Sequence, residues 1–546
     1  MAEGVTMVPF VGGSYDLSAR YVSPQRTINF YPENTAQGSG ARVPQLLAST
    51  PGEKCLATVS EDGYACRGMH WSSTGPDGSP CLWAVFGRTL YRYKHAPGAE
   101  NSAPEEVAGA IASGSNAVSM ADNGYVLAIA DGTHLWACDL LEAEANNLQL
   151  KAVTLPKMGE SEIEVMPSMV AYISARFVIN NYDTTNPAAR NVFLFSNLNS
   201  QMPGSAANAI SFEIPGVEPA TAQYYSAEYS ADPIDAMVVN EGRLWLLGPN
   251  SYEVWAPGAN SDTGDDPFDW VSGATADIGI QAPESLAQIA DYVFWLGGSA
   301  SGRNGVYMAS GLRPPQRVST NALDRRIAEI ASSKAGVGFC YTDEGHVFYC
   351  LTFEAAKWTI VYDVSTQLWH ERSNRNWETG EDGAWIPRFP VTGFDERLFW
   401  GTSDGQIVEL DHASGKMIDA ATGLADKPAV RRRIGPVLWS ADKRIVVRDL
   451  YVDMEVGTTG EVKPEPVGSI VPNSQNPKAM LSVSRDGGNT WGPSRWRSFG
   501  RQGNYTKTVH WLNLGWGRSF VASLAISEDF PFTVSGLRVV IEECAR

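Results

Sequence analysis

Two short apolar strands joined by a tight turn recur along this chain, and this pattern constrains the fold more than any other feature. Its clearest copy spans residues 240–255. Residues 244–247 (Leu-Trp-Leu-Leu) are the first expected strand, residues 248–250 (Gly-Pro-Asn) the turn, and residues 252–255 (Tyr-Glu-Val-Trp) the second strand. Short β-rich segments on either side of a Gly/Asn turn are typical of a β-hairpin. A single hairpin is only marginally stable in water, so this one must pack against others.

Six further segments have the same design. They are residues 82–93, 125–136, 176–195, 292–308, 346–362 and 398–410. Their turns recur at intervals of roughly 45 to 65 residues, the length expected for a four-stranded propeller blade with its loops. The repeat therefore predicts an all-β fold with a roughly seven-bladed β-propeller over residues 51–430, whose first blade opens at Thr50-Pro51-Gly52. Stacked sandwiches with hairpins at a similar spacing are the alternative that the sequence leaves open.

Length and composition agree with a large all-β protein. The chain has 546 residues, of which 43% are hydrophobic and 19% charged, and it contains 52 Gly and 32 Pro. A chain of this length exceeds one compact core, so we expect two or more domains. Abundant turn residues and few charges favour a β-rich protein over a helical or disordered one. The N-terminal residues lack a basic segment followed by an apolar run, and no apolar stretch reaches transmembrane length, so we expect synthesis in the cytoplasm and no membrane-spanning segment.

Three segments outside the hairpins carry structural predictions. Residues 1–50 are an expected N-terminal arm in which residues 27–31 alternate as a strand; this strand either pairs with the last blade and closes the ring or reaches a neighbouring subunit. Residues 196–233, rich in Asn, Ser, Ala and Tyr, are an expected insertion and a candidate contact loop. Residues 321–333 are the one expected helix, with Asn321 as its N-cap.

The pattern changes near residue 430. Residues 431–546 predict a C-terminal β-sandwich of about 110 residues, an ordinary domain size. Its expected strands are residues 444–452, 480–484, 506–511, 520–527 and 534–541. Arg431, Arg432 and Arg433 stand at its start and are a possible partner interface, because they could anchor an acidic surface or a phosphate. A solvated hinge between the domains is the alternative.

One sharp motif lies inside the expected sandwich. The run Ser-Arg-Asp-Gly-Gly-Asn-Thr-Trp fits the Asp-box pattern S-x-D-x-G-x-T-W, with Ser484, Asp486, Gly488, Thr490 and Trp491 at its defined positions. Asp486 is expected to accept hydrogen bonds from turn amides, Gly488 to supply unusual backbone dihedrals, and Trp491 to pack beneath the turn. The motif is a structural turn motif and carries no catalytic chemistry.

Patterns for catalysis or metal binding are not found in the sequence. The 7 cysteines are scattered and the 7 histidines lack metal-site spacing, so we expect no metal, no cofactor and no catalytic residue. Loop carboxylates such as Asp265, Asp266, Glu378 and Asp382 are expected to be solvated turn residues. We therefore expect no enzyme. The alternative is a propeller glycoside hydrolase or sialidase acting on surface glycans, which needs two facing carboxylates or an arginine triad in a pocket at the axis.

Several landmarks, taken in order, resemble one protein family. They are residues 25–33 (QRTINFYPE), 50–52 (TPG), 67–71 (RGMHW), 90–91 (LY), 251–255 (SYEVW), 279–283 (GIQAP), 295–297 (WLG), 318–324 (VSTNALD), 514–516 (LGW), 520 and 531–541. In this order they are similar to the tail-hub proteins of short-tailed phages, also called packaged-DNA stabilisation proteins or tail accessory factors. The similarity spans nearly the whole chain. The single Asp box and the insertion at residues 196–233 depart from the family pattern.

The resemblance implies a structural protein of the virion tail. It implies a homo-oligomeric hub or nozzle, with a hexamer expected, below the head-to-tail adaptor protein. Such a hub retains packaged DNA, seats the tail needle or tip and the tailspikes or fibres, and forms part of the DNA ejection channel. The net charge of −19 agrees with transient passage of double-stranded DNA, since attraction to phosphates requires Lys and Arg, although solubility explains the acidity equally well. A host-type propeller that binds peptides as a monomer is a third hypothesis.

Overall fold

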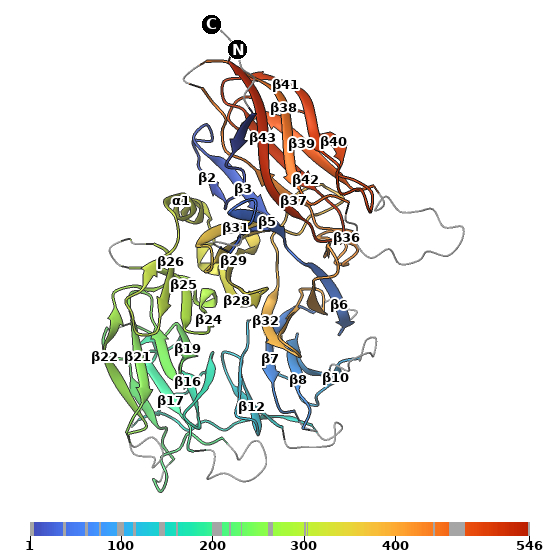
Figure 1. Ribbon diagram of the computed structural model, residues 1–546. Coiled ribbons are helices and arrows are strands. Elements are labelled where there is room, and N and C mark those ends of the chain that lie inside the picture. Colours follow the sequence, from blue (N-terminus) through green and yellow to red (C-terminus); the bar gives the residue numbers. More distant parts are fainter. Residues whose placement is uncertain are drawn as a thin grey trace.

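A ring of seven sheets and a β-sandwich make up the part of the chain that the structure describes (Figure 1). The computed structural model describes residues 5–36, 40–59, 64–75, 78–94, 103–112, 116–140, 148–159, 162–198, 210–217, 220–230, 232–259, 266–299, 302, 304–440, 443–457 and 476–543. In Figure 1 the sandwich lies above the ring, and both ends of the chain lie at its far end.

Each sheet of the ring is one propeller blade, and the strands follow one another outward from the axis. Blade 1 contains β7 (Cys66–Ser72), β8 (Cys81–Phe86), β9 (Thr89–Tyr93) and β10 (Glu105–Glu106). Blade 2 contains β11 (Ser119–Asp122), β12 (Val126–Ala130), β13 (Leu135–Asp139) and β14 (Leu150–Ala152). Blade 3 contains β15 (Val170–Ile173), β16 (Arg176–Asn180), β17 (Val192–Phe195) and β18 (Tyr224–Ser226). Blade 4 contains β19 (Ala236–Asn240), β20 (Arg243–Leu247), β21 (Tyr252–Pro257) and β22 (Phe268–Ala276).

The remaining blades are less regular. Blade 5 contains β24 (Ala287–Ile289), β25 (Tyr292–Gly298), β26 (Gly305–Ser310) and β27 (Gln316–Arg317), and β23 (Gly279–Ile280) also pairs with β25. Blade 6 contains β28 (Val337–Asp343), β29 (His346–Phe353), β30 (Trp358–Asp363) and β31 (Leu368–Arg372). Blade 7 contains β32 (Arg388–Gly393), β33 (Arg397–Gly401), β34 (Gln406–Asp411) and β6 (Gly52–Thr58). The short strands β35 (Lys416–Met417) and β36 (Lys427–Pro428) form a separate pair.

The second and third strands of the blades are the hairpins expected from the sequence, so the predicted propeller is confirmed. Their strands are apolar on both faces because each blade is covered on both sides; every residue of β8, for example, is buried. Seven hydrophobic clusters fill the spaces between neighbouring blades around the ring. A tight turn joins β19 to β20, the first two strands of blade 4. Glu241 and Gly242, with φ of 47° and 69°, form this two-residue turn, whose twist matches that of the strands.

The ring is closed by β6, which pairs antiparallel with β34 of blade 7. The prediction that residues 27–31 close the ring is therefore wrong, as is the prediction that residues 50–52 open the first blade. Leu56 and Ala57 of β6 instead fill the space between blades 7 and 1. Main-chain hydrogen bonds between β6 and β34 thus join the first part of the propeller to its last blade. The strand β32 of blade 7 lies against β7 of blade 1 and completes the inner wall of the ring.

The sandwich is built from both ends of the chain. One sheet has the order β4 (Phe30–Asn34), β5 (Gln45–Ser49), β43 (Thr533–Glu543), β38 (Ile445–Met454) and β41 (Val509–Gly517), with β1 (Val5–Val8) also on β43. The other has the order β3 (Pro24–Ile28), β37 (Arg431–Ile434), β42 (Val521–Ile526), β39 (Lys478–Ser484) and β40 (Arg495–Ser498), with β2 (Tyr15–Asp16) on β3. One large apolar cluster lies between the two sheets. The N-terminal segment is thus part of the sandwich rather than a free arm.

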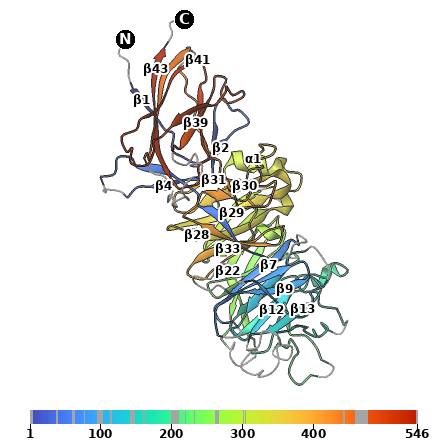
Figure 2. The same cartoon turned by 90° about the vertical axis from the view of Figure 1, so that its right-hand side faces the viewer.

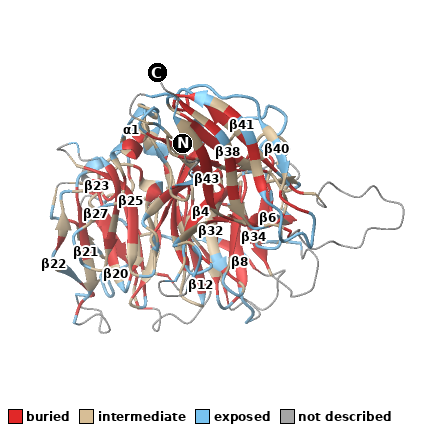
Figure 3. Ribbon diagram, turned by 45° about the horizontal axis from the view of Figure 1, so that its top comes forward, coloured by how far each residue is buried: buried red, intermediate tan, exposed pale blue. Residues whose placement is uncertain are grey.

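Blade 6 and the second sandwich sheet form one continuous sheet of ten strands, because β3 pairs with both β31 and β37. Figure 2 shows the consequence: blade 6 lies directly beside the sandwich. Figure 3 shows buried residues running through the strands of both bodies.

The helix and the expected insertion differ from their predictions in detail. The helix α1 (Asn321–Glu329) is capped by Thr320, whose hydroxyl accepts a hydrogen bond from the Leu323 amide at 3.3 Å, and not by Asn321. The expected insertion at 196–233 contains β18, the fourth strand of blade 3; its residues 199–209, 218–219 and 231 lie outside the described residues. Across the described chain, no helix is long and apolar enough to cross a membrane.

Candidate functional site: the joint and its tryptophan groove

The joint between propeller and sandwich forms where β3 lies between β31 and β37. Asn29 follows β3, is 1% exposed, and adopts a φ of 54° that asparagine tolerates. Its backbone N–H donates to the carbonyl of Glu371 at 2.8 Å. Its side-chain amide donates to the carbonyls of Ser373 and Val430 at 2.9 and 3.0 Å. Three distant stretches of the chain therefore meet at one asparagine.

Glu371 carries the central charge of the joint and is 2% exposed. Arg26 donates from Nε to Oε1 at 2.9 Å and from Nη2 to Oε2 at 2.6 Å. The Trp358 indole donates to Oε2 at 3.0 Å, and the Arg326 guanidinium lies 3.7 Å from it. Burial alone raises the pKa of Glu371, but the charge and hydrogen bonds of Arg26, helped by Arg326 and Trp358, outweigh burial and lower it. The carboxylate is therefore ionised at neutral pH and binds β3 to blade 6.

Arg431 and Arg433 are completely buried at this joint. Arg433 donates four hydrogen bonds of 2.7–2.9 Å to the N-terminal segment, at the carbonyls of Phe10 and Gly13 and the side chains of Gln25 and Thr27. Arg431 donates at 2.8 and 3.0 Å to the carbonyls of Glu528 and Thr50. Burial lowers the pKa of both guanidinium groups to about 9, still above neutral pH. The predicted partner interface is thus wrong for these two arginines, because both side chains are completely buried inside the chain.

Arg432 points to the opposite side of β37, into a groove of about 430 Å³. Arg432 and Arg375 each bind one oxygen of Asp382 at 2.8 Å. Trp377, Trp491 and Trp496 line the same groove and are 37%, 38% and 51% exposed. We call it the tryptophan groove, defined by Arg375, Trp377, Arg432, Trp491 and Trp496. The structure thereby brings together Arg432 and Trp491, which the sequence places in two unrelated motifs.

The Asp-box residues form a closed network of hydrogen bonds. The carboxylate of Asp486 accepts from the amides of Asn489 and Thr490 at 3.0 and 2.9 Å and from the Thr490 hydroxyl at 2.6 Å. The Ser484 hydroxyl donates to Asp486 at 2.7 Å and accepts from the Gly488 amide at 2.8 Å. Burial raises the pKa of Asp486, but these bonds outweigh it and lower the pKa to about 2.

The glycines of this turn are required by its close contact with the N-terminal segment. Gly488 has a φ of 97°, and a Cβ there would lie 3.0 Å from the Cβ of Pro24. Gly487 has a φ of 77°, and a Cβ there would lie 2.9 Å from the Cα of Tyr21. The Trp491 ring lies at this turn, 4.0 Å from the position of a Cβ on Gly488, and it also opens onto the tryptophan groove.

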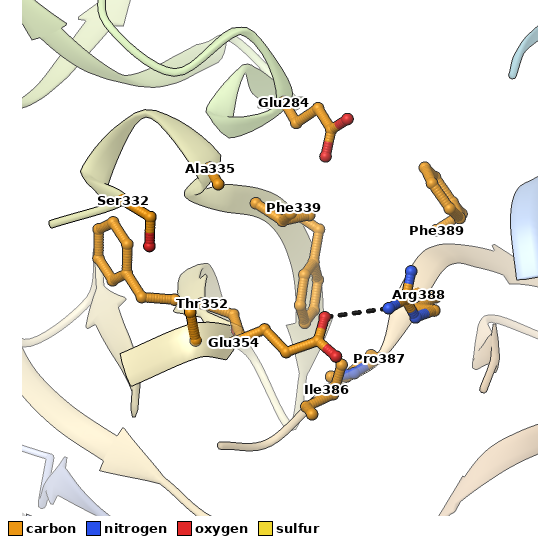
Figure 4. Close-up of a pocket in the computed structure, with 13 residues that line it drawn as sticks. Glu284, Ser332, Ala335, Phe339, Thr352, Glu354, Ile386, Pro387, Arg388 and Phe389 are labelled. Carbon is orange, nitrogen blue, oxygen red and sulfur yellow. Dashed lines mark hydrogen bonds and ion pairs between the residues drawn. The ribbon is translucent and has the colours of Figure 1, made fainter. Parts of the chain in front are cut away.

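A second hollow, of about 520 Å³, lies beside the first strand of blade 6 (Figure 4). Phe339, Phe353 and Phe389 make its walls largely apolar. Glu354 and Arg388 form an ion pair across it at 3.0 Å. Among the described residues that line it, Arg388 is the only arginine, so this hollow lacks the arginine triad that a sialidase needs.

The loop carboxylates considered from the sequence do not form a facing pair where they are described. Asp382 binds the two groove arginines, and Glu378 lies on an exposed turn. Asp266 accepts a hydrogen bond from the Tyr225 hydroxyl at 3.3 Å on the far side of the ring, and Asp265 lies outside the described residues. Within the described part of the chain, no group of three His, Cys, Asp or Glu side chains is placed to hold a metal ion.

Sequence reasoning missed Asn29, Glu371, Trp377 and Trp496. Arg26 and Glu371 are 345 residues apart, and no local pattern connects them. The run Arg495-Trp496-Arg497 is polar and aromatic in alternation, which is a weak signal for a half-exposed edge strand.

Two family models agree with this architecture. Residues 215–414 match the family model described as bacteriophage P22 Gp10, beta-propeller, and residues 431–542 match the one described as bacteriophage P22 Gp10, beta-sandwich. No curated protein matches the sequence of this chain. Among solved structures, the extracellular domain of a hybrid two-component system from B. thetaiotaomicron is 10% identical with a TM-score of 0.38, over 89% of this chain and 57% of that one. This chain therefore spans just over half of that structure's length.

Two further similar structures are those of YCF48. YCF48 bound to D1 peptide is 8% identical with a TM-score of 0.34, over 66% of this chain and 99% of that one. YCF48 from Cyanidioschyzon merolae is 10% identical with a TM-score of 0.29, over 66% of this chain and 98% of that one.

Proposed function

Because the chain belongs to the bacteriophage P22 Gp10 family of tail-hub and stabilisation proteins, and is thus a structural protein of the tail of a short-tailed phage, we propose that it forms the hub or nozzle below the head-to-tail adaptor. In this role it is a homo-oligomer, expected to be a hexamer, that retains packaged DNA. It also seats the tail needle and the tailspikes or fibres, forms part of the ejection channel, and catalyses no reaction.

The observation that carries this proposal is the ten-stranded sheet that runs through both domains. Domains of one chain ordinarily move relative to each other unless their interface is large and apolar. Here main-chain hydrogen bonds of β3 and the ion pair of Arg26 with the buried Glu371 hold blade 6 against the sandwich. A body held in this way transmits force between the partners bound at its two ends, as a hub under the pressure of packaged DNA must.

We place one partner contact at the tryptophan groove. Trp and Arg are the residues most enriched where binding energy concentrates in protein interfaces, and this groove presents three Trp and two Arg. Trp496→Ala and Arg432→Ala are each expected to weaken binding of one virion partner by about tenfold or more. Trp439→Ala is the matched control, since Trp439 is 70% exposed and does not line the groove. Equal binding by all three variants would contradict this assignment.

The net charge of −19 supports passage of DNA without adhesion. Phosphates release counterions only where Lys or Arg neutralise them, so an acidic wall gives DNA little affinity.

Particles assembled without this chain are expected to fill with DNA and then lose it, which nuclease protection of the packaged genome measures.

The assembly itself is tested with the purified chain and the head-to-tail adaptor. Light scattering and negative-stain microscopy are expected to show six copies of the chain on the adaptor ring. A chain that stays monomeric in the presence of the adaptor would refute the hub. Hydrolysis of chromogenic glycosides by the purified chain would refute the absence of catalysis.

A further inference from the structure

A hollow of about 440 Å³ opens between blades 3 and 4, at the outer strands of the ring. Four aromatic rings line it: Tyr225 from β18, Tyr229 just after it, Trp255 from β21 and Trp270 from β22. Figure 1 shows β21 and β22 on the outer side of the propeller, away from the sandwich. We call this set of rings the aromatic cage. It includes the last part of residues 196–233, the segment that the sequence indicates as a contact loop.

The rings are held in place by the protein itself. Tyr225 and Trp255 are stacked with centroids 5.6 Å apart and planes at 12°. Phe193 packs edge-on behind Trp255 with centroids 5.2 Å apart. The Glu253 carboxylate accepts hydrogen bonds from the Trp255 indole at 2.7 Å and from the Tyr229 amide at 3.0 Å. Two walls of the cage are therefore positioned before any ligand arrives, which lowers the entropic cost of binding.

The mouth of the cage is open to solvent. Trp270 is 45% exposed and Tyr229 is 42% exposed, although large aromatic side chains are usually well covered in a folded protein. Both rings can therefore be reached by a side chain that projects from another surface.

Carboxylates surround these rings. Glu253 lies at the back and is 5% exposed, while Glu228 is exposed at the mouth. The Tyr229 hydroxyl donates to Asp277 at 3.2 Å, and the Tyr225 hydroxyl donates to Asp266 at 3.3 Å. Among the described residues that line the hollow there is no Lys or Arg.

The electrostatics of the two glutamates favour a positive guest. Burial raises the pKa of Glu253, and the neighbouring charge of Glu228 raises it further. A cation placed between them relieves the repulsion between the two carboxylates. The positive charge of Arg176 acts on Tyr225, but Arg176 is itself buried and lies 5.9 Å from the centre of the Phe195 ring.

The combination of ring faces and carboxylates selects for charge. The face of an aromatic ring is electronegative and attracts ammonium and guanidinium groups, most strongly for Trp. An anion is repelled by Glu228 and Glu253. A purely apolar guest would remove water from these carboxylates without offering them a hydrogen bond or an opposite charge. We propose that the aromatic cage binds the guanidinium or ammonium group of an arginine or lysine on a basic segment of a partner protein.

A protein side chain is the favoured source of this cation for two reasons. The cage is a shallow, open site on the outer rim rather than an enclosed cavity, and its aromatic composition is typical of the centre of a protein interface. The chain also carries a net charge of −19, so a basic partner is attracted from a distance before the cage is reached. The assignment does not depend on the proposed function.

The test uses the full chain and two synthetic peptides of equal length, one alternating Arg and Gly and one with the neutral isostere citrulline in place of Arg. Isothermal titration in about 0.15 M salt screens general attraction to the acidic surface. The Arg peptide is expected to bind at least about tenfold more tightly than the citrulline peptide. Trp270→Leu is expected to weaken binding of the Arg peptide by about tenfold, and Glu228→Gln by about threefold. Trp439→Leu is the matched control and is expected to bind as the unchanged protein does, because Trp439 is exposed elsewhere.

Several outcomes would overturn the proposal. Equal affinity of the Trp270→Leu and Trp439→Leu variants would show that general charge attraction accounts for binding. Equal affinity for the two peptides, or no binding of either at millimolar concentration, would show that the cage does not recognise a cation. If tetramethylammonium chloride binds as tightly as the Arg peptide, the cage belongs to a small quaternary cation and the partner segment is wrong.

Discussion

Replacing Glu371 by glutamine removes the charge at the joint while preserving the size of the side chain. The carboxylate accepts two bonds from Arg26, at 2.9 and 2.6 Å, and one from Trp358 at 3.0 Å. An amide cannot accept at both of its heavy atoms, so one donor loses its partner and Arg26, whose side chain is 28% exposed, loses its closest carboxylate. Breaking a fully buried ion pair from one side costs about 3–5 kcal/mol, and the partial exposure of Arg26 together with the retained amide oxygen places Glu371→Gln near the lower value.

A penalty of about 3 kcal/mol corresponds to a change of roughly a hundredfold in the opening equilibrium of the joint. Native-state hydrogen exchange measures it at the Asn29 amide, which donates to the Glu371 carbonyl across the joint. The matched control is Glu354→Gln, because the pair of Glu354 with Arg388 is 55% and 28% exposed and such pairs contribute about 0–1 kcal/mol. Equal protection of the Asn29 amide in both variants would refute the view that the pair of Arg26 and Glu371 holds the joint.

The same pair is expected to make the joint less stable as the pH falls. The pKa of Glu371 is lowered in the folded chain from an ordinary value of 4.5, so the unfolded chain takes up a proton first as the pH falls. The stability from ionised Glu371 is fully present above about pH 5 and is lost as the pH falls through the folded value. The difference between the native protein and Glu371→Gln is therefore expected to be constant from pH 6 to 8 and to shrink below about pH 4.5. A difference that grows on acidification would contradict the sign of this argument.

Further predictions concern single buried or strained residues. His370→Leu is expected to make the stability of the chain less sensitive to acid. Burial lowers the pKa of His370 to about 3, and neither ring nitrogen has a hydrogen-bond partner among the described residues. At pH 5 the native protein therefore loses about 2 kcal/mol of its free energy of unfolding, which the variant keeps, and urea unfolding at pH 5 and 7 measures this difference. Parallel pH profiles would contradict it. Asp486→Ala is expected to lose about 1–2 kcal/mol in thermal unfolding, because four donors of the turn lose their acceptor, whereas Asp486→Asn retains part of this stability; equal melting temperatures would contradict that role. Gly488→Ala is expected to destabilise the chain by about 1 kcal/mol more than Gly503→Ala, since both glycines have positive φ but only a Cβ on Gly488 would press against Pro24. Equal losses of stability would show that Pro24 moves aside at no cost.

The propeller could be predicted from the sequence because each of its repeated hairpins is encoded by residues that are close together in the chain. The two strands of each repeated hairpin lie close together in the chain, and their apolar residues occur on both faces because every blade is covered on both sides. The Asp box was equally accessible, since Asp486 bonds to residues no more than four positions away.

Ring closure, the joint and the grooves were decided only in the tertiary structure. The strand β6 looks like the start of blade 1 because it precedes β7, yet its hydrogen-bonding partner β34 lies some 350 positions later. Arg431 and Arg433 look solvated because charged residues usually are, and only the folded chain brings together the carbonyl oxygens of Phe10, Thr50 and Glu528 that accept their hydrogen bonds. Local periodicity reports which faces of a strand are covered, but the identity of a distant partner depends on how the whole chain closes, and no short pattern encodes it.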